Sequence, residues 1–476
     1  MSATATDLSS TIDPSSASRI SSTTTRWLST LAAGVGLMVA QILRNPKVLD
    51  RIWAEDGAVF AREAFDGHIW QQIGRGYAGY LLVPQRTLAA PIVSVVPPSQ
   101  WAHWFTLASV TVAAFAALAV FRLSEGILHR WETRAALAVL VAVGPKMRGE
   151  WPAISNVGWP LLVAIFWAIV SVRIDRPSTL LRCAIAAAAI TSSGLGLAFL
   201  PLAVLILAGR DLPVVARFLD RSSLVKGGAE RARLKRADRY VLFTIVVAGA
   251  LQVLGTATSE AGQKAFRTNT TDIAKLLVVR VFGSVVVGER FIDEAWRSWG
   301  MWFGLGALVI VAVGLVVLLR RSDRSRRSLA IVAVGYAVAI GAASLRTRGT
   351  EPFALQPHRF SFDAERYFVI PAFLVISAIA IAVDRWCISP STDVTTQLSP
   401  AARSLAAPRA FAVFVVVVLI GAGFNVRNKE EPSDPWSVAL RVARSTCTGD
   451  PGLARVDIPI APAGIFRLNV PCSRLR

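Results

Sequence analysis

Residues 299–320 read WGMWFGLGALVIVAVGLVVLLR, an apolar run that carries no charge before Arg320. A helix needs roughly 20 consecutive apolar residues to cross the hydrocarbon core of a bilayer, so this stretch is long enough for one transmembrane helix. The whole chain has a similar character, with 54% hydrophobic and 17% charged residues and a mean hydropathy of +0.51 over 476 residues. A soluble chain of this length would be more polar. The sequence therefore predicts an all-α integral membrane protein that crosses the bilayer several times.

Other apolar segments extend this pattern to about eleven transmembrane helices within residues 27–424. The predicted spans are 27–44, 101–121, 134–145, 159–172, 180–192, 196–209, 239–256, 299–320, 329–345, 366–383 and 410–424. Residues 1–26 are rich in Ser and Thr and lack the basic start and early apolar core of a signal peptide, so we expect a disordered tail there. Residues 425–476 follow the last span as a small segment outside the membrane.

The net charge of +20 arises from basic clusters in short segments between the predicted spans. These clusters lie within residues 122–134, 173–182, 210–239, 320–327 and 385–409. Cytoplasmic loops of membrane proteins carry such an excess of Lys and Arg. With the spans above, all clusters fall on one side, which predicts a cytoplasmic amino terminus and an extracytoplasmic carboxyl terminus in the cell membrane. This distribution does not indicate a nucleic-acid partner.

Two apolar stretches do not fit simple crossings. Residues 81–96 are interrupted by two prolines and by Arg86, which favours a re-entrant or surface-lying segment, since irregular backbone at membrane depth must be buried in protein or line a cavity. A kinked spanning helix is the alternative, and it would change the predicted sidedness. Residues 273–288 carry Lys275 and Arg280 in an otherwise apolar sequence, which favours an amphipathic helix on the membrane surface.

The four cysteines divide between the two predicted sides. Cys183 and Cys387 lie in or beside spans on the reducing side, where each is expected to be an inert, small apolar residue. Cys447 and Cys472 lie in the extracytoplasmic segment, where oxidising conditions allow a disulfide, and we predict one between them. The alternation in residues 456–460 predicts a short strand in the same segment. Metal-ligand spacing of the CxxC type is absent from the sequence, so a zinc site is not indicated.

A pair of acidic residues directly follows the first predicted span. Residues 51–60 read RIWAEDGAVF, in which Trp53 and Phe60 bracket Glu55 and Asp56. Transfer of a sugar to a hydroxyl group needs a carboxylate that takes the hydroxyl proton, and we expect Asp56, or otherwise Glu55, in that role. A solvated loop, with Glu55 capping the following helix, is the simpler alternative.

A second set of groups is suited to bind phosphate. Arg366 and Tyr367 lie at the predicted outer end of a span, and His358 and Arg359 precede them. An arginine side chain can donate two hydrogen bonds to one phosphate group, so these residues are candidates for binding the phosphate of a lipid-linked sugar. The alternatives are a snorkelling anchor for Arg366, an interfacial aromatic belt for Tyr367 and a solvated loop for His358 and Arg359.

Further residues of the predicted outer loops are candidate contacts to an acceptor or a sugar. Aromatic rings suit the apolar face of a pyranose, although tyrosines at a membrane interface are usually belt residues. The candidates are Tyr77, Tyr80, Arg86, Glu150 and Asn156. Glu150 and Asn156 flank a predicted tight hairpin.

The first-loop acidic pair, the many spans and the late outer Arg366-Tyr367 resemble the membrane glycosyltransferases of the GT-C superfamily. The string Trp53-x-Glu55-Asp56-Gly57-x-x-Phe60, with Gly79-Tyr80-Leu81, Pro84 and Arg86 further on, is similar to bacterial integral membrane proteins allied to that superfamily. The resemblance implies a polyprenyl-phosphate-sugar donor, inverting transfer to a cell-envelope glycan or lipid, an outward-facing site and Asp56 as base.

The resemblance also leaves points open. Some relatives use a divalent cation, and Glu55 with Asp56 offers oxygen ligands for Mg²⁺, Mn²⁺ or Ca²⁺. Many superfamily members carry a large soluble carboxyl-terminal domain, whereas only about fifty residues follow the final predicted span here, so we expect the loops rather than a carbohydrate-binding module to recognise the acceptor. The alternatives are a transporter or flippase, a ligase or polymerase of lipid-linked glycans, and a structural scaffold. The lipid bilayer is an expected partner in every case.

Overall fold

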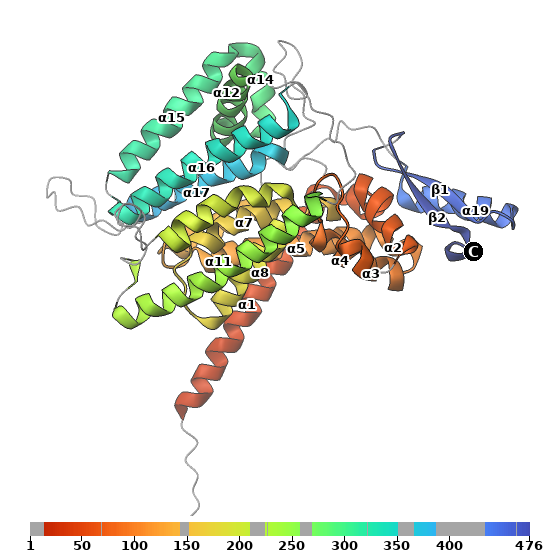
Figure 1. The fold of residues 1–476 in the computed structure, drawn as a ribbon, viewed down its shortest axis with the longest axis horizontal. Coiled ribbons are helices and arrows are strands. Elements are labelled where there is room, and N and C mark those ends of the chain that lie inside the picture. Colours follow the sequence, from red (N-terminus) through yellow and green to blue (C-terminus); the bar gives the residue numbers. More distant parts are fainter. Residues whose placement is uncertain are drawn as a thin grey trace, which may run out of the picture.

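The computed structural model describes residues 14–67, 69–142, 152–209, 224–225, 227–257, 269–320, 322–350, 366–386, 434–462 and 464–476. Over these residues the chain is a helical bundle with a small α/β unit at its carboxyl end (Figure 1). The helices of the first half are α1 (Pro14–Arg44), α2 (Arg62–Asp66), α3 (Ile69–Ile73), α4 (Val83–Val95), α5 (Trp101–Leu123), α6 (Trp131–Ala142), α7 (Gly158–Val170), α8 (Arg176–Ser192) and α9 (Leu200–Ala203). The later ones are α11 (Gly228–Ala257), α12 (Thr270–Leu276), α13 (Ser284–Val287), α14 (Glu289–Trp299), α15 (Met301–Leu319), α16 (Arg324–Arg348), α17 (Arg366–Trp386) and α19 (Trp436–Gly449).

Tighter and wider helical turns join several of these helices. The 3₁₀ turns include η1 (Pro46–Asp50), η3 (Pro98–Gln100), η4 (Ile154–Asn156), η5 (Gly194–Phe199) and η11 (Cys472–Arg474), and the π-helical turns are η2 (Asp56–Ala61), η6 (Val204–Ala208) and η9 (Leu277–Gly283). Single π turns inside helices often occur at functional sites. One of them, η2, begins at Asp56.

Five helices of the described ranges are long and apolar enough to cross a membrane. They are Pro98–Leu123, Gly228–Ala257, Met301–Leu319, Arg324–Thr347 and Tyr367–Asp384. Shorter apolar helices cover Leu28–Arg44, Ile154–Val170 and Gly194–Ala208. An α-helix rises 1.5 Å per residue, so the 13 residues of α7 extend over only about 20 Å. The structure thus agrees with a helical, multi-pass membrane protein, and the predicted span 410–424 lies outside the described residues.

The first helix is longer than the sequence suggested. We predicted a disordered tail over residues 1–26, but α1 already begins at Pro14. Extending an existing helix by one residue costs less free energy than forming a new first turn. The apolar part of α1 can therefore support helical structure in the polar residues that precede it. Residues 1–13 lie outside the described part.

Basic loops that are far apart in sequence meet at one end of the bundle, here called the basic end. The carboxylate of Asp384, at the end of α17, accepts the backbone N–H of His129 at 2.8 Å. The guanidinium of Arg326, in the first turn of α16, lies 3.0 Å from Nδ1 of the same histidine. Arg122 pairs with Asp175 across 3.3 Å, which joins the end of α5 to the start of α8. The structure thus gathers the loops within 122–134, 173–182 and 320–327 on one side, as predicted.

The other ends of these helices form the opposite face, here called the acidic-pair end. Contacts at this end join Val48 to Thr106, Asp56 to Ser155, Gln85 to Ser192, Leu81 to Gln252 and Trp159 to Tyr367. They connect the segment after α1 with the starts of α5, α7 and α17 and with the ends of α8 and α11. The predicted outer loops therefore also meet on one side.

The two interrupted stretches take different positions. Helix α4 has only 13 residues, and its contacts to Ser192 and to Glu63 of α2 keep it at the acidic-pair end, as expected for a re-entrant or surface-lying segment. The surface position favoured for residues 273–288 is wrong for most of their length. Six of the seven residues of η9 are buried against neighbouring helices, because Arg280 is the only charged side chain of this turn and its remaining residues are apolar.

The carboxyl-terminal unit consists of α19 and an antiparallel hairpin of β1 (Arg455–Ile460) and β2 (Phe466–Pro471). The predicted strand at 456–460 is part of β1. The predicted disulfide is present and ties Cys447 of α19 to Cys472 after β2, with the two Cα atoms 5.5 Å apart. Trp436 is buried, stacks on Trp101 and donates its indole N–H to the Pro98 carbonyl at 2.8 Å. The unit is therefore packed against the acidic-pair end.

Candidate functional site

Asp56 lies at the acidic-pair end and is only 2% exposed. Its two carboxylate oxygens accept backbone N–H groups from the start of η4, at 2.9 Å from Ile154 and 2.7 Å from Ser155. The first N–H groups of a helical turn have no partner within the turn, so a carboxylate is well placed there. Each oxygen keeps a second lone pair with which it can take a proton.

The environment of Asp56 raises the pKa of its carboxyl group from 3.8 to about 7. Burial is the largest cause, because the charged form loses its contact with water. The N–H groups of Ser155 and Ile154 oppose the increase, and the charge of the neighbouring Glu55 adds to it. A carboxyl group with a pKa near neutrality is a far stronger proton acceptor than an ordinary aspartate.

Glu55 is half-buried and stands directly before η2. Its side chain makes no capping hydrogen bond to that turn, so the structure does not support the helix-cap alternative. The residue before it, Ala54, has a φ of +27°, which is unusual for a residue with a side chain. The acidic pair is thus set on a strained bend rather than on a regular helix start.

A β-type contact to the carboxyl-terminal unit holds this bend. Ala461 accepts the N–H of Ala54 and donates its own N–H to the Ile52 carbonyl at 3.1 Å. Gly57 faces the same unit, and a Cβ atom at this position would lie 2.6 Å from Cδ1 of Ile460. This close approach and the hydrogen bonds of Ala461 join the segment of the acidic pair to the docked unit.

The phosphate-binding candidates are only partly described. Tyr367 lies in the first turn of α17, and its ring is nearly perpendicular to that of Trp159, with centroids 5.7 Å apart. Trp159 belongs to α7, which begins two residues after η4, the turn that holds Asp56. Arg366 is the first residue of α17 and so shares this end of the bundle.

Other candidates lie outside the described residues, namely His358, Arg359 and Glu150. Arg280 is a further candidate for the site, and its charge within an apolar stretch is the sequence signal for it. Arg280 is fully buried, and its guanidinium lies 5.5 Å from the ring centroid of Phe368 in the first turn of α17. It is therefore a second candidate cation beside that turn.

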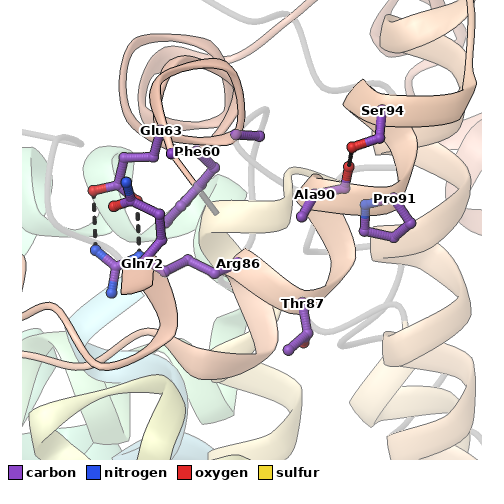
Figure 2. Close-up of a pocket in the computed structure, with 10 residues that line it drawn as sticks. Phe60, Glu63, Gln72, Arg86, Thr87, Ala90, Pro91 and Ser94 are labelled. Carbon is purple, nitrogen blue, oxygen red and sulfur yellow. Dashed lines mark hydrogen bonds and ion pairs between the residues drawn. The ribbon is translucent and has the colours of Figure 1, made fainter. Parts of the chain in front are cut away.

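Arg86 and Glu63 line a pocket of about 470 Å³ between α2 and α4 (Figure 2). The Arg86 guanidinium forms a two-point ion pair with Glu63, at 2.7 and 3.1 Å, and also donates to the carbonyls of Arg75 and Leu81. Arg86 was predicted as a sugar contact, whereas Glu63 was missed. Glu63 lies seven residues after Asp56 on the same helical segment, and this spacing was the available signal.

The remaining predicted contacts are placed around this region. Tyr77 and Tyr80 pair through their backbones across a two-residue turn, and the Tyr80 ring packs so closely on Gly194 that a Cβ atom there would lie 2.4 Å away. Burial raises the pKa of Tyr77, and the charges of Glu55 and Glu63 raise it further. Its ring packs against the apolar cluster that contains Ile52 and Phe60. Asn156 is buried in η4, directly after the donors to Asp56.

No protein-family model matches the chain, and no curated protein matches it.

Proposed function

We propose that the protein is a GT-C-type membrane glycosyltransferase that moves a sugar from a polyprenyl-phosphate donor to a cell-envelope glycan or lipid. The observation that carries this proposal is the environment of Asp56, a buried carboxyl group whose pKa lies at about 7 in the segment that follows α1. General bases work best when their pKa lies near the operating pH.

In the proposed step, an acceptor hydroxyl oxygen attacks the anomeric carbon of the donor. The new C–O bond forms as the bond between that carbon and the phosphate oxygen breaks, and the electron pair leaves with the polyprenyl phosphate. Asp56 takes the hydroxyl proton, directly or through one water, and Glu55 is the alternate acceptor. Attack from the side opposite the phosphate inverts the anomeric centre.

The departing phosphate gains charge in the transition state, and a nearby cation stabilises it. Arg366 and Arg280 are the proposed cations, because both belong to or border the first turn of α17. The ring contact between Tyr367 and Trp159 joins the first turn of α17 to the start of α7. The same end also carries the acidic pair, as a single site requires.

The basic end is proposed to face the cytoplasm, in agreement with the positive-inside rule. The acidic-pair end, together with the disulfide-bonded unit, then faces the oxidising side of the cell membrane. Lipid-linked sugars are used there by the enzymes that this chain resembles.

A divalent cation between Glu55 and Asp56 remains a prediction. Both Asp56 oxygens already accept hydrogen bonds from backbone N–H groups, so a bound cation would share these oxygens with the N–H donors. Among the residues that the structure describes, three or more His, Cys, Asp or Glu side chains do not gather as a ligand set.

The test compares the envelope glycans of cells that have and lack this protein, with the wild-type gene restored as the control. We expect one glycosyl residue to disappear from a glycan or lipid and to return with the wild-type gene. Unchanged glycans would contradict the proposal. Solute movement across sealed vesicles without a new glycosidic bond would favour the transporter alternative.

The pH dependence of transfer follows from the raised pKa of Asp56. The base must be deprotonated, so the rate is expected to rise with pH, to reach half of its maximum at about pH 7 and to be roughly tenfold lower at pH 6. The measurement is sugar transfer from endogenous labelled donor in membrane vesicles between pH 5.5 and 8.5. Glu55→Gln is the control and keeps a sigmoidal profile, whereas a flat wild-type profile would rule out Asp56 as the base.

A further inference from the structure

The pocket beside α4 has the size and lining of a small-ligand site. Its volume of about 470 Å³ falls in the range that ligand pockets occupy. Phe60, Ala90 and Pro91 form apolar parts of the wall, while Glu63, Gln72 and Thr87 add polar groups. Figure 2 shows Glu63, Gln72 and Arg86 gathered on one side and Ala90 and Pro91 on the other.

The charges in this pocket cancel. Arg86 is only 2% exposed, and its guanidinium is engaged by both oxygens of Glu63 and by two backbone carbonyls. An incoming phosphate would have to displace Glu63 from this pair. The pocket is therefore unsuited to an anion and suits a neutral ligand.

The polar groups that remain are mainly hydrogen-bond acceptors. The Glu63 side chain is 16% exposed, and its oxygens have lone pairs beyond those used by Arg86. The Oε1 atom of Gln72 is buried and has no hydrogen-bond partner among the described residues. A buried acceptor without a donor costs free energy, so this atom favours a ligand that donates a hydrogen bond.

We propose that this pocket binds one neutral sugar unit of the acceptor glycan, with its hydroxyl groups donating to Glu63 and Gln72. The apolar wall at Ala90 and Pro91 then faces the C–H side of the sugar ring. This inference rests on the proposed function, and it assigns the acceptor to the pocket and the donor phosphate to the first turn of α17.

Tyr77 connects the pocket to the acidic pair. Its ring packs against the apolar cluster that contains Phe60 of the pocket wall, and the carbonyl of Arg75, two residues earlier, accepts a hydrogen bond from Arg86 of the pocket. In addition, Phe60 of the pocket wall and Asp56 belong to the same helical turn, η2. A sugar in the pocket therefore lies next to the segment that carries the base.

The test measures binding to the full-length protein in nanodiscs by saturation-transfer NMR. The probes are the methyl glycosides of glucose, mannose, galactose and arabinose, with inorganic phosphate as a competitor. We expect at least one glycoside to bind and phosphate not to displace it. Ala90→Phe fills the pocket while leaving the Glu63–Arg86 pair in place, and it should abolish the signal; Gln72→Ala should weaken binding by about tenfold.

Ala250→Phe is the matched control, because Ala250 is an exposed alanine of α11 that does not line the pocket, and it should bind as the wild type does. The proposal is overturned if no glycoside binds, if phosphate displaces the bound one, or if Ala90→Phe leaves the signal unchanged. Asp56→Asn separates the two proposals, since it should lose transfer and keep binding. Binding without any transfer activity would contradict the proposed function alone, and full transfer by Ala90→Phe would contradict the pocket alone.

Discussion

Replacing Asp56 with Asn is expected to reduce sugar transfer by roughly a hundredfold to ten-thousandfold, the contribution that a positioned general base makes. An asparagine keeps the shape of the side chain, but its amide group cannot take the acceptor proton. The measurement is the initial rate of transfer from labelled lipid donor in vesicles that contain equal amounts of each protein.

The same substitution has a structural cost that must be separated from the chemical one. Both oxygens of Asp56 accept N–H groups of η4, and an amide NH₂ would face one of those donors. The loss of such a hydrogen bond costs about 1–3 kcal/mol of stability. Thermal unfolding of the variant in detergent shows whether the protein remains folded at the assay temperature.

Asp384→Asn is a matched control for this loss. Asp384 is fully buried, and its two oxygens likewise accept backbone N–H groups, at 2.8 Å from His129 and 2.9 Å from Arg130. It lies at the basic end of the bundle and has no proposed chemical role. Asp384→Asn should therefore lose stability and keep transfer, whereas equal activity of Asp56→Asn and the wild type would show that Asp56 is only a cap. Loss of transfer in Glu55→Gln alone would move the base to Glu55.

Removing the disulfide is expected to have the second large effect. The bridge joins cysteines 25 residues apart, and closing a loop of that length lowers the entropy of the unfolded state by the equivalent of about 3.5 kcal/mol. In Cys447→Ser, we expect the carboxyl-terminal unit to unfold at a lower temperature and to become sensitive to proteases. Limited proteolysis followed by mass spectrometry measures this change.

Unfolding of the carboxyl-terminal unit should also disturb the acidic pair, because the unit holds the strained bend at Ala54 through Ala461 and packs against Gly57. Transfer is therefore expected to fall together with protection of the unit. Cys183→Ser is the control, since Cys183 is a free, half-buried thiol away from the unit, and it should change neither property. A Cys447→Ser protein with an unfolded unit and full transfer would show that docking does not position the base.

Much of the architecture was predictable because hydropathy and charge act locally. The apolar run at 299–320 became α15, and the basic loops gathered at one end of the bundle. The number of transmembrane helices was less predictable. Segments such as α7 are apolar but short, and neighbouring helices rather than lipid alone bury them. Local hydropathy does not distinguish these two kinds of burial.

The candidate site was predictable only in part. The acidic pair is visible in sequence because adjacent carboxylates beside a span are unusual. The partners of Asp56 are backbone N–H groups of residues about a hundred positions later, and side-chain identity carries no signal for them. Glu63 was missed for a similar reason, since only the fold brings it to Arg86. The surface position expected for 273–288 failed because the charge of Arg280 was taken as a sign of contact with water.

The most direct measurement of the central claim is a structure of the protein with a non-hydrolysable polyprenyl phosphonate sugar bound. We expect the phosphonate beside the first turn of α17, near Arg366 or Arg280, and the anomeric carbon on the side that faces Asp56. A phosphonate bound at the basic end, or a sugar separated from Asp56 by packed helices, would contradict the account.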